Sequence, residues 1–277
     1  MRHDSFFSKT DPPYIIAELG SFAPHKELKQ TIDKVSDAGV DAVKFQYFVA
    51  SDLVPGDDAR FDMYVDCMWS TFEFGIKPLI DYARSKLLDV GCSFFSTNGI
   101  HAYGSEVDFI KIASPESTWT ALIEAARASK PTLVSVPWHI KTPYEMFKDV
   151  DYLDCWAGYP AVFKKPLTPV QTSGISDHTL GFQALSLTPK IIEKHFGSSE
   201  GPNGPVNMHP DNAKMFVDIA HNRYKGPKPT LTRSEKDGFR YRPPTTTNEK
   251  PEPSKDLLIQ MRDLLTKYEW KLKDETE

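Results

Sequence analysis

Short apolar segments alternate with amphipathic helical patterns along the first 225 residues of this chain, and no other feature constrains the fold as strongly. We expect eight strands, at residues 14–20, 41–48, 92–97, 109–114, 131–136, 152–157, 173–178 and 191–196. Strands that alternate with helices form a parallel sheet that the helices cover. Eight units in 225 residues fit a closed (β/α)8 TIM barrel better than an open sheet.

The first expected helix illustrates the pattern. Residues 26–39 place Leu28, Ile32 and Val35 on one helical stripe, and Gly39 suits the position just after a helix C-terminus. Further helices are expected near residues 75–88, 118–129 and 210–224.

Other connections do not fit full helices. The stretch between the second strand and residue 75 is long and irregular in pattern. The connections near 98–107 and 179–190 are too short for complete helices. We therefore expect a barrel in which some helices are shortened.

The sequence changes character at Lys225. Residues 226–277 begin with a segment rich in Pro, Thr, Lys and Arg, which is typical of an extended linker. Residues 256–272 then place apolar side chains at heptad-like spacing, which predicts a single amphipathic helix. We expect a barrel domain at residues 1–225, followed by this linker and helix at 226–277.

Composition excludes several classes of function. A formal net charge of −5 provides no basic surface for a phosphate backbone, so we expect no nucleic-acid partner. No run of about 18 apolar residues is present, which argues against a membrane partner and favours a cytoplasmic location. Cys67, Cys92 and Cys155 are scattered and form no CxxC pair, so we expect a reducing compartment and cysteines that belong to the core.

Polar side chains gather at the carboxyl ends of several expected strands. Side chains two residues apart on a strand point to the same face, so neighbouring polar residues of this spacing share a face. In a (β/α)8 barrel the carboxyl ends of the strands form the active face. The residues concerned are Glu18, Lys44 with Gln46, Thr97, Ser176 with His178, and Glu193 with His195.

The two histidines of this set predict a metal site. His178 and His195 end neighbouring expected strands, so both imidazoles can face one divalent ion. Glu193 or Glu18 would orient a ligand or its water. Two histidines with a carboxylate and water suit manganese, iron or zinc.

Two lysines in the barrel interior allow two interpretations. Lys44 and Lys111 either form a Schiff base with a carbonyl substrate or hold a phosphate and a carboxylate as point charges. Hydroxyl groups at Thr97, Ser114 and Ser176 accompany them and favour the anion-binding interpretation. The Schiff-base aldolase stays as an alternative.

Seven segments, taken in order, resemble the N-terminal domain of the sialic acid synthase family, which includes N-acetylneuraminate, legionaminate and pseudaminate synthases. The resemblance covers residues 13 to 225, and "SDHTLG" followed by "IEKHF" is its most specific part. The segments are "YIIAELG", "DAVKFQ", "FFST", "FIKIAS", "YP" at 159–160, "ISDHTLG" and "IIEKHF".

This resemblance implies a (β/α)8 enzyme, a transferase that condenses phosphoenolpyruvate with an aldose such as an N-acylated aminosugar. The product would be a nonulosonic (2-keto-3-deoxy) acid together with phosphate. The family uses a divalent metal, usually Mn²⁺, with Mg²⁺, Zn²⁺ and Fe²⁺ as alternatives, and its synthases form homodimers. Position by position, the resemblance implies metal ligands at His178 and His195, phosphoenolpyruvate contacts at Lys44, Thr97, Lys111, Ser114 and Ser176, further site residues at Gln46 and Tyr159, and acidic catalytic groups at Glu18 and Glu193.

The chain departs from the family pattern mainly on the sugar side. An alanine, Ala157, replaces an asparagine two residues before the "YP" tyrosine, and Val206 replaces an aspartate that holds sugar hydroxyls in the family. The family's C-terminal antifreeze-like domain, which supplies an arginine to a neighbouring subunit, has no counterpart here. Arg240 or Arg242 is our hypothesis for its replacement. The alternative to a divergent enzyme is a barrel that has lost catalysis and binds a sugar or anion, or serves in a complex.

Overall fold

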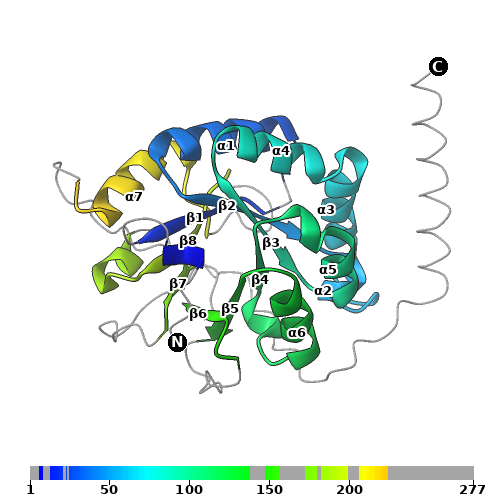
Figure 1. The fold of residues 1–277 in the computed structure, drawn as a ribbon. Helices are drawn as coiled ribbons and strands as arrows, with labels where there is room; N and C mark the ends of the chain where they lie inside the picture. The colour runs from blue at the N-terminus through cyan, green and yellow to red at the C-terminus, as the bar shows by residue number, and fades with distance from the viewer. Residues whose placement is uncertain are drawn as a thin grey trace.

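The computed structural model describes residues 6–8, 13–20, 23, 25–137, 147–155, 172–179, 182–198 and 206–223. Eight parallel strands pair in chain order and close into one barrel, in which the last strand lies beside the first (Figure 1). The predicted (β/α)8 TIM barrel is therefore confirmed. The strands are β1 (Tyr14–Glu18), β2 (Ala42–Tyr47), β3 (Asp89–Phe94), β4 (Phe109–Ile112), β5 (Thr132–Pro137), β6 (Asp151–Cys155), β7 (Gly174–Asp177) and β8 (Ile191–His195).

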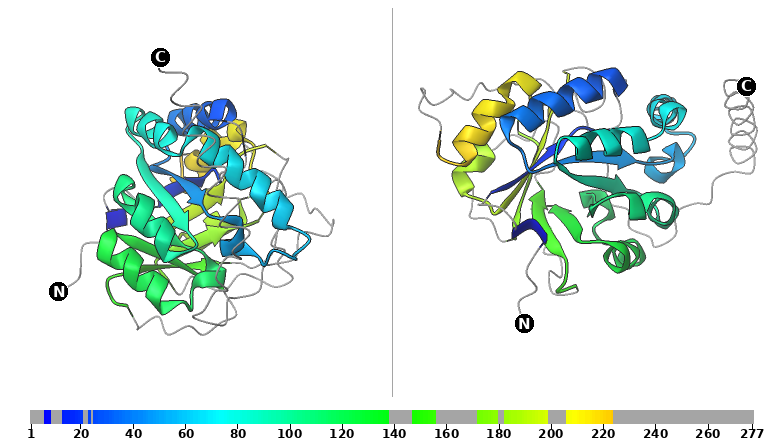
Figure 2. Two further views of the ribbon diagram at one scale, coloured as in Figure 1. Left: turned by 90° about the vertical axis from the view of Figure 1, so that its right-hand side faces the viewer. Right: turned by 45° about the horizontal axis from the view of Figure 1, so that its top comes forward.

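Helices surround this barrel, as the two further views in Figure 2 show. Within the described ranges, none of the helices is both long and apolar enough to cross a membrane. The α-helices are α1 (His25–Ala38), α2 (Ala50–Leu53), α3 (Phe61–Phe74), α4 (Lys77–Ser85), α5 (Thr97–Tyr103), α6 (Thr120–Ser129) and α7 (Ala213–Ala220). The 3-10 helices are η1 (Phe6–Ser8), η2 (Gly104–Glu106), η3 (Ser114–Glu116), η4 (Gln183–Leu187) and η6 (Pro210–Asn212).

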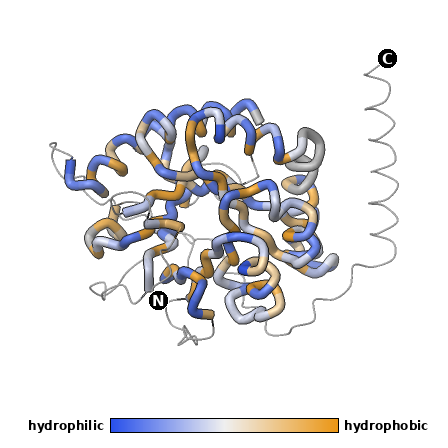
Figure 3. Tube along the Cα trace, in the orientation of Figure 1, coloured by the Kyte–Doolittle hydropathy of each residue, from blue (hydrophilic) through white to orange (hydrophobic). Residues whose placement is uncertain are grey.

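Helix α1 packs as its sequence predicts. Leu28, Ile32 and Val35 are buried in the layer between the barrel and the helices. Gly39 follows the helix with a φ of 89°, a left-handed conformation that glycine adopts without strain. The alternation of hydrophilic and hydrophobic residues along α1 and α7 is visible in Figure 3.

The prediction of an irregular stretch after the second strand is wrong. It contains α2 and the 14-residue helix α3. The sequence of α3, "FDMYVDCMWSTFEF", spreads aromatic and apolar residues around the helix, so it lacks the polar face that identifies an amphipathic helix. The short connections are confirmed: α5 has seven residues, and the described part of the 179–190 connection forms only the 3-10 helix η4.

Three predicted site residues lie beyond the ends of their strands, although the sequence places them within the strands. Thr97 is the first residue of α5 and Ser114 begins η3, whereas both were expected to end strands. His178 follows the last residue of β7. Polar residues at the carboxyl end of a barrel strand form the turn into the next connection. The two-residue alternation of the sequence continues into this turn, so it predicts a strand that is too long. The linker and helix expected at 226–277, and Arg240 and Arg242 within them, lie outside the described residues, as do Ala157 and Tyr159.

Aromatic side chains close the amino-terminal end of the barrel. Phe6 and Phe7 of η1 contact Tyr14 and Phe109 edge to face or at a tilt, with ring centroids between 5.2 and 6.5 Å apart. Gly91 leaves room for this packing, because a Cβ atom there would lie 2.2 Å from the Phe109 ring. The apolar floor leaves the carboxyl end as the face on which a site can form.

Candidate active site

The barrel interior changes from apolar to polar within one step of two residues along every strand. The lower inward positions are Ile16, Ala42, Gly91, Phe109, Leu133, Leu153, Gly174 and Ile191. Two residues further along the same strands are Glu18, Lys44, Ser93, Lys111, Ser135, Cys155, Ser176 and Glu193, all of them buried. This second layer contains four ionisable side chains other than cysteine, which is costly unless they are paired.

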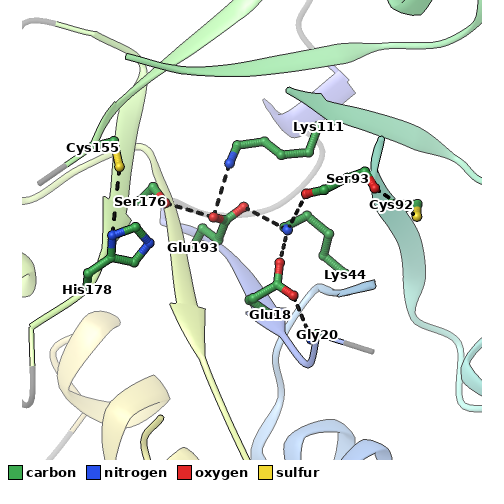
Figure 4. A network of polar contacts seen from close by, with 10 residues as sticks. All are labelled: Glu18, Gly20, Lys44, Cys92, Ser93, Lys111, Cys155, Ser176, His178 and Glu193. Carbon is green, nitrogen blue, oxygen red and sulfur yellow. Dashed lines mark hydrogen bonds and ion pairs between the residues drawn. The ribbon is translucent and has the colours of Figure 1, made fainter. Parts of the chain in front are cut away.

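Glu193 lies at the centre of this layer (Figure 4). Its Oε1 accepts hydrogen bonds from Lys111 Nζ at 3.1 Å and from Ser176 Oγ at 2.8 Å. Its Oε2 lies 3.8 Å from Lys44 Nζ. The carboxylate of β8 therefore joins lysines from β2 and β4 across the barrel.

Lys44 has a second acidic partner. Its Nζ forms an ion pair with Glu18 Oε2 and donates a hydrogen bond to Ser93 Oγ at 2.7 Å. Glu18 Oε1 accepts a hydrogen bond from the backbone N–H of Gly20 at 2.6 Å, which holds the carboxylate at the end of β1. The two lysines and two glutamates thus form one buried network of balanced charge.

Burial and neighbouring charges shift the protonation of this network. Burial lowers the pKa of Lys44 to about 8, against the opposing effect of the Glu193 carboxylate, and the Lys111 ammonium lowers it further. Burial alone would raise the pKa of Glu193, but the Lys111 and Lys44 ammoniums outweigh burial and hold that pKa well below its usual range. Glu193 is consequently an anion at neutral pH.

The two histidines lie side by side at the next level. The rings of His178 and His195 have centroids 5.2 Å apart and planes inclined at 59°. Burial lowers the pKa of His195 well below its ordinary value, and the neighbouring His178 adds to this effect. A neutral imidazole is the form that binds a metal ion. The Sγ of Cys155 lies 3.8 Å from His178 Nδ1, on the side of the ring away from Glu193 (Figure 4).

A larger cluster of metal-binding side chains is not found. In the part of the chain that the structure describes, no three His, Cys, Asp or Glu residues are placed so that they could hold an ion together. The glutamates that were expected beside a metal are engaged with the lysines instead. The described residues therefore offer such an ion two protein ligands, His178 and His195.

The remaining predicted residues surround the network with differing exposure. Ser114 is buried at the start of η3, whereas Gln46 and Thr97 are half-buried near the carboxyl ends of β2 and β3. Ser96 caps the helix that Thr97 begins, and its Oγ donates a hydrogen bond to Asp52 Oδ2 at 2.9 Å. Tyr159 lies outside the described residues.

Three inward residues were missed by the sequence analysis. Ser93 and Ser135 belong to the polar layer, and the Ser135 hydroxyl has no hydrogen-bond partner among the described residues. Cys155 was expected in the core, and it is buried, but its thiol faces the site and has a pKa raised by burial to about 11. The two-residue spacing from Leu133 and Leu153 would have located Ser135 and Cys155.

Comparison with known proteins places this site in a family context. The model of the NeuB family matches residues 31–226. The chain is 27% identical over 248 residues to an uncharacterized protein of Methanocaldococcus jannaschii, covering 77% of this chain and 72% of the relative. It is also 27% identical over 253 residues to the spore coat polysaccharide biosynthesis protein SpsE of Bacillus subtilis, covering 76% and 67% of the two chains.

The fold is likewise similar to solved structures. The crystal structure of SpsE superimposes with a TM-score of 0.58 at 25% identity, covering 78% of this chain and 69% of that one. An N-acetylneuraminic acid (sialic acid) synthetase from Leptospira borgpetersenii serovar Hardjo-bovis, solved in complex with citrate, superimposes with a TM-score of 0.66 at 21% identity, covering 79% and 88%. At that identity the second likeness concerns the fold alone.

Proposed function

The chain belongs to the NeuB family, and from this premise we propose that it is a phosphoenolpyruvate-dependent sugar acid synthase. It would condense phosphoenolpyruvate with an aminosugar or a related aldose and release a nonulosonic (2-keto-3-deoxy) acid and phosphate. The relative SpsE supports the broader assignment, because it is by name a spore coat polysaccharide biosynthesis protein.

One observation carries the proposal, namely the buried layer of cations and hydroxyl groups at the carboxyl end of the barrel. Phosphoenolpyruvate carries up to three negative charges in a small volume, so a site that excludes water must supply cations for it. Lys44 and Lys111 are 2% and 3% exposed, and hydroxyls at Ser135 and Ser176 project into the same layer. We expect phosphate and carboxylate oxygens to compete with Glu193 for these donors.

The reaction assigns a task to each group of the network. C3 of phosphoenolpyruvate forms a bond to the aldehyde carbon, water adds at C2, and the C2–O bond to phosphate breaks. Lys44 and Lys111 neutralise the substrate and the leaving phosphate. Glu18 and Glu193 are close enough to Lys44 to move protons between it, the attacking water and the new hydroxyl.

The histidine pair fits the divalent ion that the family resemblance implies. Two imidazoles with centroids 5.2 Å apart are close enough that they would hold one ion together. His195 has the lowered pKa of a neutral ligand. When bound, such an ion would supply Lewis-acid activation of the aldehyde oxygen. Mn²⁺ is our first choice, because two nitrogen ligands with oxygen ligands suit it.

The proposal is tested by phosphate release from phosphoenolpyruvate with Mn²⁺ and a panel of aldoses. In ¹⁸O-labelled water, cleavage of the C2–O bond leaves the released phosphate unlabelled. Lys111→Met should lower kcat/KM by about 100-fold or more, since a charged donor is lost. The exposed Lys77→Met is the matched control and should retain full activity.

Two outcomes would remove the proposal. If phosphate release stays at background with every aldose and metal, the chain does not catalyse this condensation. Calorimetric binding of phosphoenolpyruvate or a sugar without turnover would then favour the alternative, a barrel that only binds its ligand. Irreversible trapping of pyruvate by borohydride on Lys44 or Lys111 would instead support the Schiff-base aldolase.

A further inference from the structure

A further buried ion pair lies on the outer face of the barrel wall, separate from the network of the site. Lys194 Nζ is 3.2 Å from Asp177 Oδ2, and both side chains are fully buried. Along β7 and β8 their neighbours Ser176 and Glu193 point inward, so Asp177 and Lys194 point toward the layer of helices. The proposed reaction uses neither of them.

Their position in the apolar outer core makes this pair costly. Ile175 and Ile192 share the outward face of the same strands and are buried in the main hydrophobic cluster. Removing two charges from water costs several kcal/mol for each ion, and replacement by apolar side chains often leaves a protein as stable or more stable. Stability alone is therefore a weak reason for an ion pair at this place.

The pair makes further contacts that fasten the chain around His178. Lys194 Nζ donates a hydrogen bond to the carbonyl oxygen of Thr179. The backbone N–H of Thr179 donates to Asp177 Oδ1 at 2.8 Å. The residues before and after His178 are thus both held by groups that do not enter the site.

This arrangement links the two histidines through the barrel wall. Lys194 immediately precedes His195 in the chain, and it pairs in register with Asp177 between β7 and β8. A shift of Thr179 relative to Lys194 would move the backbone of His178 relative to His195. Groups that orient metal ligands from outside the coordination sphere commonly change metal affinity by about 10- to 100-fold.

We propose that Asp177 and Lys194 are positioning residues that fix the distance between the His178 and His195 rings from the far side of the barrel wall. The inference rests on the proposed function in taking these imidazoles as ligands of a divalent ion. The Asp177–Lys194 pair holds the 177–179 turn against β8 and thereby keeps the two imidazole rings 5.2 Å apart.

The experiment compares Asp177→Asn, Lys194→Met and the double variant in the full chain. The double variant removes both charges, keeps both side-chain volumes and leaves no unpaired ion, so it should be more stable than either single variant. Free Mn²⁺ is measured by electron paramagnetic resonance. We expect the Kd for Mn²⁺ to rise about 10- to 100-fold in the double variant. In Lys194→Arg, which retains the charge, the Kd should rise less than in Lys194→Met.

A matched control separates positioning from stability. Tyr14→Phe removes the hydrogen bond to Asp89, 2.6 Å long, at the opposite end of the barrel. It should lower Tm and leave the Kd for Mn²⁺ unchanged. If the folded double variant binds Mn²⁺ as the wild type does, Asp177 and Lys194 serve the fold only and the inference is wrong.

A readout without metal distinguishes this inference from the proposed function. With rings 5.2 Å apart, selectively labelled histidines should show a nuclear Overhauser effect between His178 and His195 in the metal-free wild type. The effect should be lost in the double variant. A wild type that shows it but binds no Mn²⁺ contradicts the proposed metal site and leaves the positioning role intact, whereas an unchanged effect in the double variant overturns the positioning role.

Discussion

Lys44 is the residue whose protonation should govern the pH dependence of this site. Its pKa of about 8 lies below the ordinary lysine value of 10.5, so the free protein loses this positive charge as the pH rises through 8. We predict that kcat/KM for phosphoenolpyruvate falls above about pH 8, because this constant reports the ionisation of the free enzyme. The bound anion favours the ammonium form, so kcat should fall less and at higher pH.

Steady-state kinetics between neutral pH and about pH 10 check this prediction. Lys44→Met lacks the ammonium and should have low activity without the alkaline decline. A wild-type kcat/KM that stays level through this range would contradict the assigned role. The folding stability should change in the opposite direction to the activity. Between pH 8 and 10.5 the unfolded chain binds more protons at Lys44 than the folded chain does, so the contribution of Lys44 to the free energy of unfolding should increase with pH.

Single residues of the site could be predicted from the sequence where side chains alternate between the two faces of a strand. This alternation placed Lys44, Lys111 and Glu193 on the inward face, and the structure joins them in one network. It could not predict that the carboxylates of Glu18 and Glu193 contact lysines rather than the histidines. That choice depends on the stagger of eight strands around a closed barrel, which no local pattern encodes.

At the scale of elements, the contact between β3 and β4 sets the shape of the barrel floor. Gly91 faces the ring of Phe109, and its missing side chain provides the space that the ring occupies. We predict that Gly91→Ala lowers the free energy of unfolding by about 1–3 kcal/mol, because the added methyl group overpacks a filled interior. Urea unfolding measures this change.

Two further variants make the interpretation specific. Gly56→Ala is the matched control, since a Cβ atom there would contact nothing within 4 Å, and it should leave the stability nearly unchanged. Phe109→Leu shortens the opposing side chain and should recover part of the loss in the double variant with Gly91→Ala. Equal effects of the alanines at positions 91 and 56 would show that the floor is not tightly packed at Gly91.

The elements differ in how well the sequence predicts them. The strands were located as short apolar runs, since they are buried on both faces, and α1 was located by the one stripe that it buries. Helix α3 was missed, since its aromatic residues do not form one stripe. The turns after β3, β4 and β7 were predicted as extended, because the polar residues that leave those strands continue the same alternation. Periodicity locates an element more reliably than it locates the end at which a site forms.

At the scale of the whole molecule, closure of the barrel links the two ends of the described chain. β1 pairs with β8 along its full length, from Tyr14 opposite Ile191 to Glu18 opposite His195. Helix α7 follows β8 and packs beside α1, where a Cβ atom on Gly39 would lie 3.9 Å from Val217 (Figure 1). The last strand and last described helix therefore complete both layers of the barrel.

This closure predicts that the barrel folds without the segment from residue 226 onward. A chain that ends at residue 225 retains every pairing between β1 and β8 and the buried side chains of α7, so it keeps all of the core that the structure describes. We expect it to unfold in one cooperative transition at the Tm of the full chain, as followed by circular dichroism. A shorter chain that ends at Asn212 lacks α7 and is the control.

The shorter chain should be strongly destabilised. Phe216 and Val217 are fully buried, and each contributes about 1.5–3 kcal/mol through burial of apolar surface. Without them the stripe of α1 that contains Ile32 and Val35 loses part of its cover. If the chain ending at residue 225 is as unstable as the one ending at Asn212, the later segment belongs to the folding unit. A Tm equal to that of the full chain instead places the boundary of the folding unit at the end of the eighth βα unit, where the alternating pattern of the sequence stops.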